Sequence, residues 1–263
     1  MSIYSDTPIL VFFTVVFAIL GAVMGSFLNC AAWRIAHNES FFKGRSRCPT
    51  CGHALGVPDL IPVFSYIFLG GKCRFCKTKI SPRYLISELF MSALFVGCLL
   101  RFDLTPLCAV NVVFICCLFT LTLTDLETYI IPNGTLIVAV AAWLIWLPFS
   151  GLGWIDIGFR FLSAVVYGGG VLLLSLIMDK VLKKESLGGG DVKLFFVMGL
   201  YLGLVPSLFA VMLACILGLL FVLISKKKRG EHFPFGPAIA AATVVMLFCG
   251  ELLANWYISF FKA

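Results

Sequence analysis

Four of the eleven cysteines form two pairs with C-x-x-C spacing, Cys48 with Cys51 and Cys73 with Cys76. Two thiolates three positions apart on a turn bind one side of a tetrahedral ion, and a second pair binds the other side. Two disulfides are the alternative, but disulfides seldom persist in the reducing cytosol. The spacing therefore predicts a structural Zn²⁺ ion that folds its segment and has no open position to activate water.

Two aspartates stand at the ends of apolar runs. Asp125 closes one run shortly before Pro132, and Asp191 opens another run directly after Gly188–Gly190. Three successive glycines allow close backbone approach and unusual dihedral angles. Each aspartate also has a simpler possible role, because Asp125 could be a boundary charge and Asp191 a helix cap.

The two aspartates together suggest a reaction. Two carboxylates held close together share one proton, so the ionised member can activate a water while the protonated member polarises a peptide carbonyl. The three histidines belong to no zincin or nucleophile-elbow motif, and no Ser-His-Asp or Cys-His pattern competes. If both aspartates lie at one membrane depth, they predict hydrolysis of a peptide bond by the aspartic-protease mechanism.

The composition indicates that these residues belong to a membrane protein. Hydrophobic residues make up 61% of the 263 residues and charged residues only 13%, whereas soluble domains are about half apolar and a quarter charged. In lipid, each apolar run must pair its backbone groups internally and so forms a helix. We expect eight spans, at about 9–33, 85–100, 106–124, 133–149, 157–179, 191–205, 206–225 and 237–258.

The boundary between the sixth and seventh spans is the hardest to place. The stretch from Lys193 to Ile224 is too long for one crossing and short for two. An even number of crossings keeps Lys193 and the basic residues after Ile224 on one side, so we place a break near Pro206.

The net charge of +7 reflects topology. Of the 20 Lys and Arg residues, nine lie from Arg34 to Arg83, four from Lys180 to Lys193, and four from Lys226 to Arg229. The positive-inside rule places these three loops in the cytosol, with Arg101, Arg160 and Lys262 near the opposite face. No nucleic-acid partner is needed to explain the charge.

The predicted fold is therefore an all-α polytopic membrane protein of about eight transmembrane helices. Residues 1–33 hold the first transmembrane helix, and residues 34–84 form a cytosolic insert with the four cysteines, between the first and second helices. Residues 85–263 form a membrane domain of about seven helices. In this topology both aspartates face the cytosol.

At this point the sequence resembles the bacterial prepilin peptidases, or type IV leader peptidases, over nearly its whole length. It departs from the family pattern at Cys30, where an aliphatic residue is usual, and at Ala36, where proline is frequent. The resemblance is carried by Gly25-Ser-Phe-Leu-Asn29 with Arg34, the four cysteines, Asp59-Leu-Ile-Pro-Val-Phe-Ser65, Gly71-Lys-Cys-Arg74, Ile80-Ser-Pro-Arg-Tyr84, Glu88-Leu89, Asp125 with Ile131-Pro-Asn133, Gly188-Gly-Gly-Asp-Val-Lys193 and Pro234-Phe-Gly-Pro237.

The resemblance implies an aspartic endopeptidase of the bacterial inner membrane that removes the leader of prepilins or pseudopilins, with Asp125 and Asp191 as the catalytic pair. Members with the cysteine insert also methylate the new amino terminus with S-adenosylmethionine. For that step the resemblance implies Glu88, Gly71 and Lys72, whose simpler roles are a helix-start charge and a turn. The implied partners are the substrate protein and the lipid bilayer.

Two other functional classes remain open. One is a membrane scaffold whose zinc segment binds a partner while the aspartates only cap helices. The other is a transporter, in which intramembrane carboxylates relay protons. The aspartates lie at span ends rather than mid-span, which favours chemistry at the membrane surface.

Overall fold

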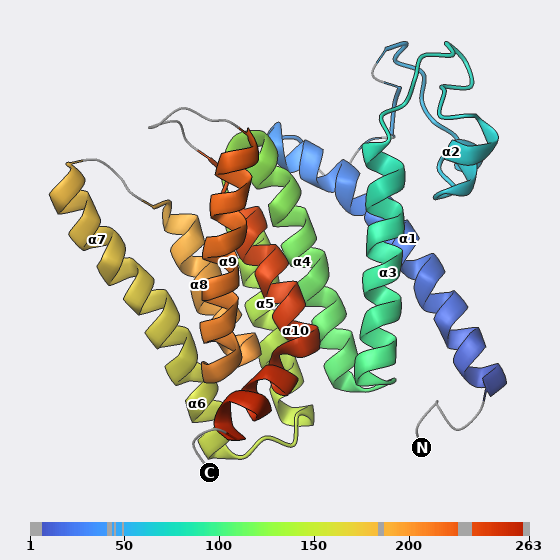
Figure 1. Cartoon of the computed structure of the whole chain (residues 1–263). Helices are drawn as coiled ribbons and strands as arrows, with labels where there is room; N and C mark the ends of the chain where they lie inside the picture. Colours follow the sequence, from blue (N-terminus) through green and yellow to red (C-terminus); the bar gives the residue numbers. More distant parts are fainter. Residues whose placement is uncertain are drawn as a thin grey trace. The chain divides into compact units, whose positions relative to one another are not determined.

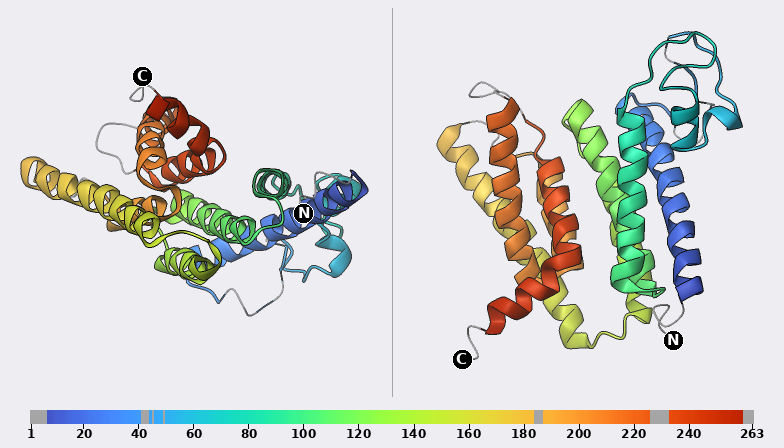
Figure 2. Two further views of the ribbon diagram at one scale, coloured as in Figure 1. Left: turned by 90° about the horizontal axis from the view of Figure 1, so that it is seen from below. Right: turned by 45° about the vertical axis from the view of Figure 1, so that its right-hand side comes forward.

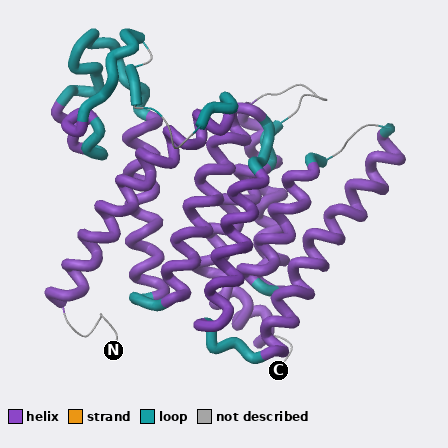
Figure 3. The backbone as a smooth tube through the Cα atoms, turned by 180° about the vertical axis from the view of Figure 1, so that it is seen from behind, coloured by secondary structure: helices purple, strands orange, loops and turns teal. Residues whose placement is uncertain are grey.

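The structure, a computed structural model, describes residues 7–40, 44, 46–48, 50–183, 187–225 and 233–259. Within these ranges every regular element is a helix, apart from two isolated bridges between single residue pairs (Figure 3). The basic cluster Lys226 to Arg229 and Lys262 lie outside the described residues. The expected all-helical class is confirmed.

Eight apolar helical segments follow one another, as expected (Figure 1). Six of those in the described ranges are long and apolar enough to cross a membrane, while α8 and α5 with η3 are shorter. The cysteine insert adds the short elements η2 (Val57–Asp59) and α2 (Phe64–Phe68). The segments are α1 (Thr7–Ala36), α3 (Arg83–Phe102), α4 (Pro106–Thr128), α5 (Asn133–Trp146) with η3 (Leu147–Phe149), α6 (Trp154–Ala164) continuing through η4 (Val165–Gly169) into α7 (Gly170–Leu182), α8 (Gly189–Leu202), α9 (Leu204–Ser225) and α10 (Gly236–Ser259).

The structure corrects the predicted break near Pro206. Helix α8 ends at Leu202 and α9 begins at Leu204, with Gly203 between them at a φ of 79°. Glycine adopts this left-handed conformation without a steric penalty, so it ends the helix. Pro206 lies in the first turn of α9, where its missing N–H has no helical partner to lose.

The chain divides into two compact units, and the first comprises Met1–Val112. In this unit α1 packs closely against α3 because Gly21 and Gly25 have no side chains. A Cβ on either glycine would lie 2.6–2.7 Å from a backbone oxygen of α3. Small residues of this kind let helices approach closely in membranes. The buried amide of Asn29 also donates a 2.6 Å hydrogen bond to the hydroxyl of Ser87, which fixes the register of the pair.

The second unit, Val113–Ala263, is built around α8. Seven of the 14 residues of α8 are buried, and the helix packs against α5, α6, η4 and α10. The Tyr201 hydroxyl donates a buried 2.8 Å hydrogen bond to the carbonyl of Ala139 on α5. The Arg160 guanidinium donates a 2.6 Å hydrogen bond to the carbonyl of Tyr201. Helices α9 and α10 lie side by side on this core (Figure 2).

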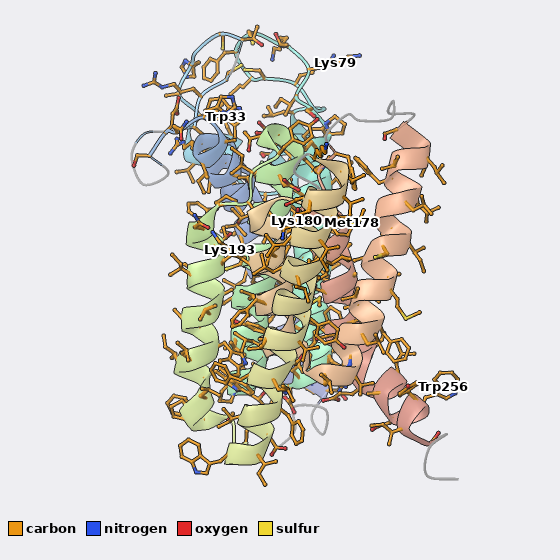
Figure 4. All side chains as sticks on the ribbon, turned by 90° about the vertical axis from the view of Figure 1, so that its left-hand side faces the viewer. Trp33, Lys79, Met178, Lys180, Lys193 and Trp256 are labelled. Carbon is orange, nitrogen blue, oxygen red and sulfur yellow. The ribbon has the colours of Figure 1, made fainter. Side chains whose placement is uncertain are left out.

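The direction of the helices in the second unit brings three helix ends together. Helix α4 ends at the same end of this unit at which α8 and α10 begin (Figure 1). Lys180 and Lys193 lie toward this end, whereas Trp256 lies at the other end (Figure 4). The end of α4 and the starts of α8 and α10 are therefore the elements that position the two aspartates.

Candidate functional site

Asp125 lies in the last turn of α4 and is buried, with 4% of its surface exposed. The helix ends just beyond it, because Tyr129 takes a left-handed conformation with a φ of 57°. The Tyr129 backbone N–H donates a 2.9 Å hydrogen bond to the Asp125 carbonyl. The side chain of Asp125 accepts a 3.0 Å hydrogen bond at Oδ2 from the backbone N–H of Gly236.

Gly236 is the first residue of α10, so its N–H has no partner within that helix and is free to bind a carboxylate. A Cβ at this position would lie 2.7 Å from Oδ2 of Asp125, closer than real contacts allow. Sequence reasoning placed Gly236 only in the motif Pro234-Phe-Gly-Pro237 and gave it no role. The structure shows that a glycine here lets the carboxylate reach the backbone.

Asp191 is the third residue of α8 and is partly buried. Its Oδ2 atom lies beside Gly188, where a Cβ would be 3.4 Å away, and Gly188 at the start of this helix has no side-chain cap hydrogen bond. The other oxygen, Oδ1, is buried and has no hydrogen-bond partner among the described residues. A buried carboxylate oxygen without a partner is costly in a native structure and is typical of functional sites.

Ile131 links the elements that carry the two aspartates. It is buried, with 8% exposed, although the preceding Ile130 is 65% exposed. Its Cβ would lie 2.9 Å from a Cβ on Gly190, and its Cδ1 would lie 3.3 Å from a Cβ on Gly236. Ile131 therefore packs against both the start of α8 and the start of α10.

The two carboxylates are close enough for their charges to interact, since Asp191 experiences the negative charge of Asp125. We call Asp125, Asp191, Ile131, Gly190 and Gly236 the aspartate site. Oδ2 of Asp125 accepts a hydrogen bond from a backbone N–H, whereas Oδ1 of Asp191 is buried and finds no partner in the part of the chain that the structure describes. The site therefore combines one anchored carboxylate with one whose buried oxygen has no partner among the described residues.

The three glycines before Asp191 contribute less than expected. None of them has a positive φ, and Gly188 is extended with φ −68° and ψ 140°. A Cβ on Gly189 would meet nothing within 4 Å. Only Gly190 makes a close approach, against Ile131. The expected unusual dihedral angles are therefore not found at these glycines.

A second polar contact ties the start of α8 to the start of α5. The Lys193 ammonium donates a 2.9 Å hydrogen bond to Oδ1 of Asn133. Asn133 is the first residue of α5 and follows Pro132, whose extended conformation marks the start of the helix. Sequence reasoning used Lys193 as a topology signal and as part of the motif Gly188-Gly-Gly-Asp-Val-Lys193, and it did not predict this contact.

In the first unit, the four cysteine sulfurs of Cys48, Cys51, Cys73 and Cys76 lie within 4.8 Å of one another. The two C-x-x-C turns have matching backbone geometry. Gly52 and Lys77, which follow the second cysteine of each turn, have φ values of 70° and 59°. Each donates its N–H to the carbonyl of the first cysteine, at 2.9 and 3.0 Å. The four sulfurs are therefore arranged as a closed set of metal ligands.

The electrostatics of this cysteine cluster favour a cation. A 3.4 Å hydrogen bond between the Cys76 sulfur and the Thr78 hydroxyl, with the Thr78 backbone, lowers the pKa of Cys76 to about 6. The hydrogen bond with the His53 backbone lowers the pKa of Cys51, but desolvation and the neighbouring sulfurs of Cys48 and Cys76 outweigh it and raise the pKa to about 11. Four thiolates repel one another, so the donor set fits a soft divalent cation such as Zn²⁺.

The three residues implied in methyl transfer lie in two places within the first unit. Gly71 and Lys72 line a hollow of about 440 Å³ together with Tyr66 and Lys79. Glu88 is buried on α3, where its carboxylate accepts a 2.7 Å hydrogen bond from the backbone N–H of Val63. Glu88 is not among the residues that line the hollow.

Comparison with protein families matches most of the chain. Residues 19–102 match the model described as Bacterial Peptidase A24 N-terminal domain, which covers the cysteine insert. Residues 112–223 match the model described as Type IV leader peptidase family, which covers both aspartates.

Curated relatives match over nearly the full length. The chain is 32% identical to the prepilin leader peptidase/N-methyltransferase of Bacillus subtilis (strain 168), over 91% of this chain and 96% of the relative. It is 34% identical to the protein of the same description from Myxococcus xanthus (strain DK1622), over 89% of this chain and 71% of the relative. The corresponding protein of Neisseria gonorrhoeae is 26% identical, over 92% and 93%. No solved structure matches the chain.

Proposed function

Because the chain belongs to the type IV leader peptidase family, we propose that it is an aspartic endopeptidase that removes the leader of a prepilin or pseudopilin. Asp125 and Asp191 are its catalytic pair in this proposal. The observation that carries it is the aspartate site, in which Ile131 packs on the starts of both α8 and α10 and the Oδ1 atom of Asp191 is buried with no partner among the described residues.

The proposed reaction is attack by a water molecule on the peptide carbonyl. The pair holds one proton, so the ionised carboxylate removes a proton from the water while the protonated carboxylate polarises the carbonyl. The proton then passes to the leaving amine, and the pair regains its starting state. The Gly236 N–H keeps Asp125 in place throughout, because it holds Oδ2 at 3.0 Å.

The proposal includes a topology. The chain lies in the bacterial inner membrane with the aspartate site at the cytosolic face. Residues 1–33 form the first span, residues 34–84 the cytosolic insert, and residues 85–263 the peptidase domain. The substrate's apolar helix lies in the bilayer and its basic leader in the cytosol, which presents the bond to be cut at the depth of the aspartates.

A second activity, methylation of the new amino terminus, is proposed on the family's N-methyltransferase description and the cysteine insert. A structural Zn²⁺ ion held by the four cysteines would fold the insert. S-adenosylmethionine would supply the methyl group when bound. Gly71 and Lys72 in the hollow and Glu88 on α3 are the candidates for the methyl-transfer site.

The test is to incubate the purified protein in lipid bilayers with a prepilin and to measure the masses of the products by mass spectrometry. The proposal predicts a product shortened by its leader and, with S-adenosylmethionine present, heavier by one methyl group. If the protein is a scaffold, the prepilin stays uncut. If it is a transporter, the prepilin also stays uncut, and a separate assay detects a proton-coupled flux. The variant Asp156→Asn is a suitable control because this carboxylate caps α6 through the Gly153 N–H, away from the aspartate site.

A further inference from the structure

The cysteine insert exposes a group of large apolar side chains in and just before α2. The most exposed is Phe68, the last residue of α2, with 83% of its surface exposed. Exposed apolar side chains gathered in this way mark a surface that binds another protein or a membrane. We call this group the α2 patch, and its members are Val57, Leu60, Ile61, Phe64, Ile67 and Phe68.

A hydrogen bond sets the level of α2 along α3. Val63, directly before α2, donates its backbone N–H to Oε2 of Glu88 at 2.7 Å. Glu88 is the sixth residue of α3, so it lies about 7.5 Å along the helix axis from Arg83, the first residue. Figures 1 and 2 show α2 level with the start of α3. The α2 patch therefore lies beside the first turns of this helix.

Helix α3 relates this level to the membrane. Its 20 apolar residues can cross a bilayer, and their length of about 30 Å equals the thickness of the hydrocarbon core. Arg83 and Arg101 stand at its two ends, where charged side chains reach the headgroups. A level about 7.5 Å inward from Arg83 is thus the boundary between headgroups and acyl chains. Ile86 and Phe90, 64% and 52% exposed, lie within two residues of Glu88 and present apolar surface at this level.

A strained turn holds α2 in this place. Val63 has φ 64° and ψ −54°, and the Phe64 N–H donates a 2.6 Å hydrogen bond to the Pro62 carbonyl, which makes a γ-turn. A positive φ is costly for a β-branched residue and persists only where surrounding contacts hold it. The buried carboxylate of Glu88 supplies such a contact. The level of α2 is therefore a specified feature of the fold.

The charges of the insert fit a membrane surface. Between Val57 and Phe68 the one charged residue is Asp59, whose Oδ1 pairs with Nε of Arg74 at 2.7 Å. Residues 72–83, which follow, contain no acidic residue. An apolar segment beside a cationic one is typical of chains that lie in the interface of anionic membranes. The exposed cationic residues of 72–83 are Lys72, Arg74, Lys77, Lys79 and Arg83.

We propose that the α2 patch inserts into the bilayer interface. Its side chains lie among the outermost acyl-chain carbons, and the cationic residues of 72–83 contact anionic headgroups. The bilayer then supports the insert together with α3 and the four cysteines. This inference goes beyond the peptidase proposal and does not depend on it. The competing occupant is protein, either the second unit of this chain or another molecule, but the contact with Glu88 places the patch at the level of lipid.

The first test is fluorescence quenching with the full-length protein in lipid bilayers. An environment-sensitive fluorescent amino acid replaces Phe68 or, as the matched control, Phe75, which is 52% exposed in the second C-x-x-C turn. Figure 3 shows the loops of the insert extending beyond the start of α3. With lipids brominated near the headgroup end of the chain, we expect emission at least about twofold weaker from position 68 and unchanged emission from position 75. Equal quenching at both positions, or no quenching at position 68, would overturn the inference.

The second test identifies what touches the patch. A photo-crosslinking amino acid replaces Phe68 or Phe75 in the same bilayers, and mass spectrometry identifies each adduct. We expect lipid adducts from position 68 and few from position 75. Adducts of position 68 with residues 113–263 or with another protein, or the absence of any adduct, would contradict insertion into lipid. Neither test measures cleavage, so a failure of the proposed peptidase activity leaves this inference standing.

Discussion

The backbone N–H of Gly236 donates a 3.0 Å hydrogen bond to Oδ2 of Asp125 across 111 residues of sequence. This bond fixes the carboxylate at the end of α4 against the start of α10. Ile131 packs on Gly236 and also on Gly190, so the same small cluster positions the start of α8 and Asp191. The geometry of the aspartate site thus depends on two glycines, Gly190 at the start of α8 and Gly236 at the start of α10, which let these helix starts approach Ile131 and the end of α4.

Gly236→Ala should disturb this site by steric contact alone. The variant keeps the backbone N–H, but its Cβ would lie 2.7 Å from Oδ2 of Asp125 and must displace the carboxylate. A displacement of ~1 Å in a catalytic group lowers activity on the order of 100-fold. The measurement is kcat/KM for prepilin cleavage, with Gly134→Ala as a control because a Cβ there meets nothing within 4 Å. Equal activity of the two variants would show that this contact does not matter.

The glycines before Asp191 offer a matched pair of variants. Gly190→Ala would bring its Cβ within 2.9 Å of the Ile131 side chain, whereas Gly189→Ala would meet no atom within 4 Å. We expect Gly190→Ala to lower kcat about tenfold or more by shifting α8 and Asp191, and Gly189→Ala to leave it unchanged. Single-turnover cleavage of a saturating prepilin measures kcat directly. Loss of activity in both variants would point to flexibility of the loop instead of packing on Ile131.

The proposed shared proton predicts a bell-shaped dependence of cleavage on pH. At low pH both carboxylates are protonated and no base remains, so the rate falls with decreasing pH. At high pH both are ionised and no acid remains to polarise the carbonyl, so the rate falls with increasing pH. A profile of kcat/KM against pH in bilayers measures this. A rate that rises to a plateau at high pH would require only one titrating group and would contradict the proposal.

The sequence was sufficient to predict the features that depend on local pattern. Hydropathy predicted eight helical segments, because backbone groups in lipid must form hydrogen bonds within their own segment. The C-x-x-C spacing predicted that the four cysteine sulfurs lie together. The prediction that Asp125 and Asp191 lie on the same side of the membrane required only the number of predicted spans between them and the positions of the Lys and Arg residues. Each of these inferences uses neighbouring residues, so no distant contact had to be known.

The features that depend on distant contacts were not predicted. No local pattern shows that Gly236 meets Asp125 or that Ile131 packs between two helix starts. The break in the 191–225 stretch was predicted near Pro206 because proline is the stronger general helix breaker. The first turn of a helix tolerates proline, so Gly203 with its φ of 79° makes the break. Position within the helix, rather than residue type, decided the outcome.

Removing a ligand of the cysteine cluster should affect the insert and leave the aspartate site unchanged. Cys73→Ser removes a buried sulfur of the cluster and should abolish zinc binding, a contribution to folding on the order of 10 kcal/mol in small zinc domains. We expect proteases to cut the insert and methylation to fall. Zinc content by mass spectrometry and limited proteolysis measure this, with the exposed Cys215→Ser on α9 as the control. Full zinc content in Cys73→Ser would refute the four-cysteine site.

The most direct measurement is cleavage of a prepilin by Asp125→Asn and by Asp191→Asn, each purified in bilayers with its zinc content determined. Replacing a carboxylate by an amide keeps the side-chain shape but removes the ability to share or accept the proton. The account predicts that each single variant loses cleavage completely while it binds as much zinc as the unaltered protein. Persistent cleavage by either folded, zinc-loaded variant would contradict a mechanism in which both aspartates act as one pair.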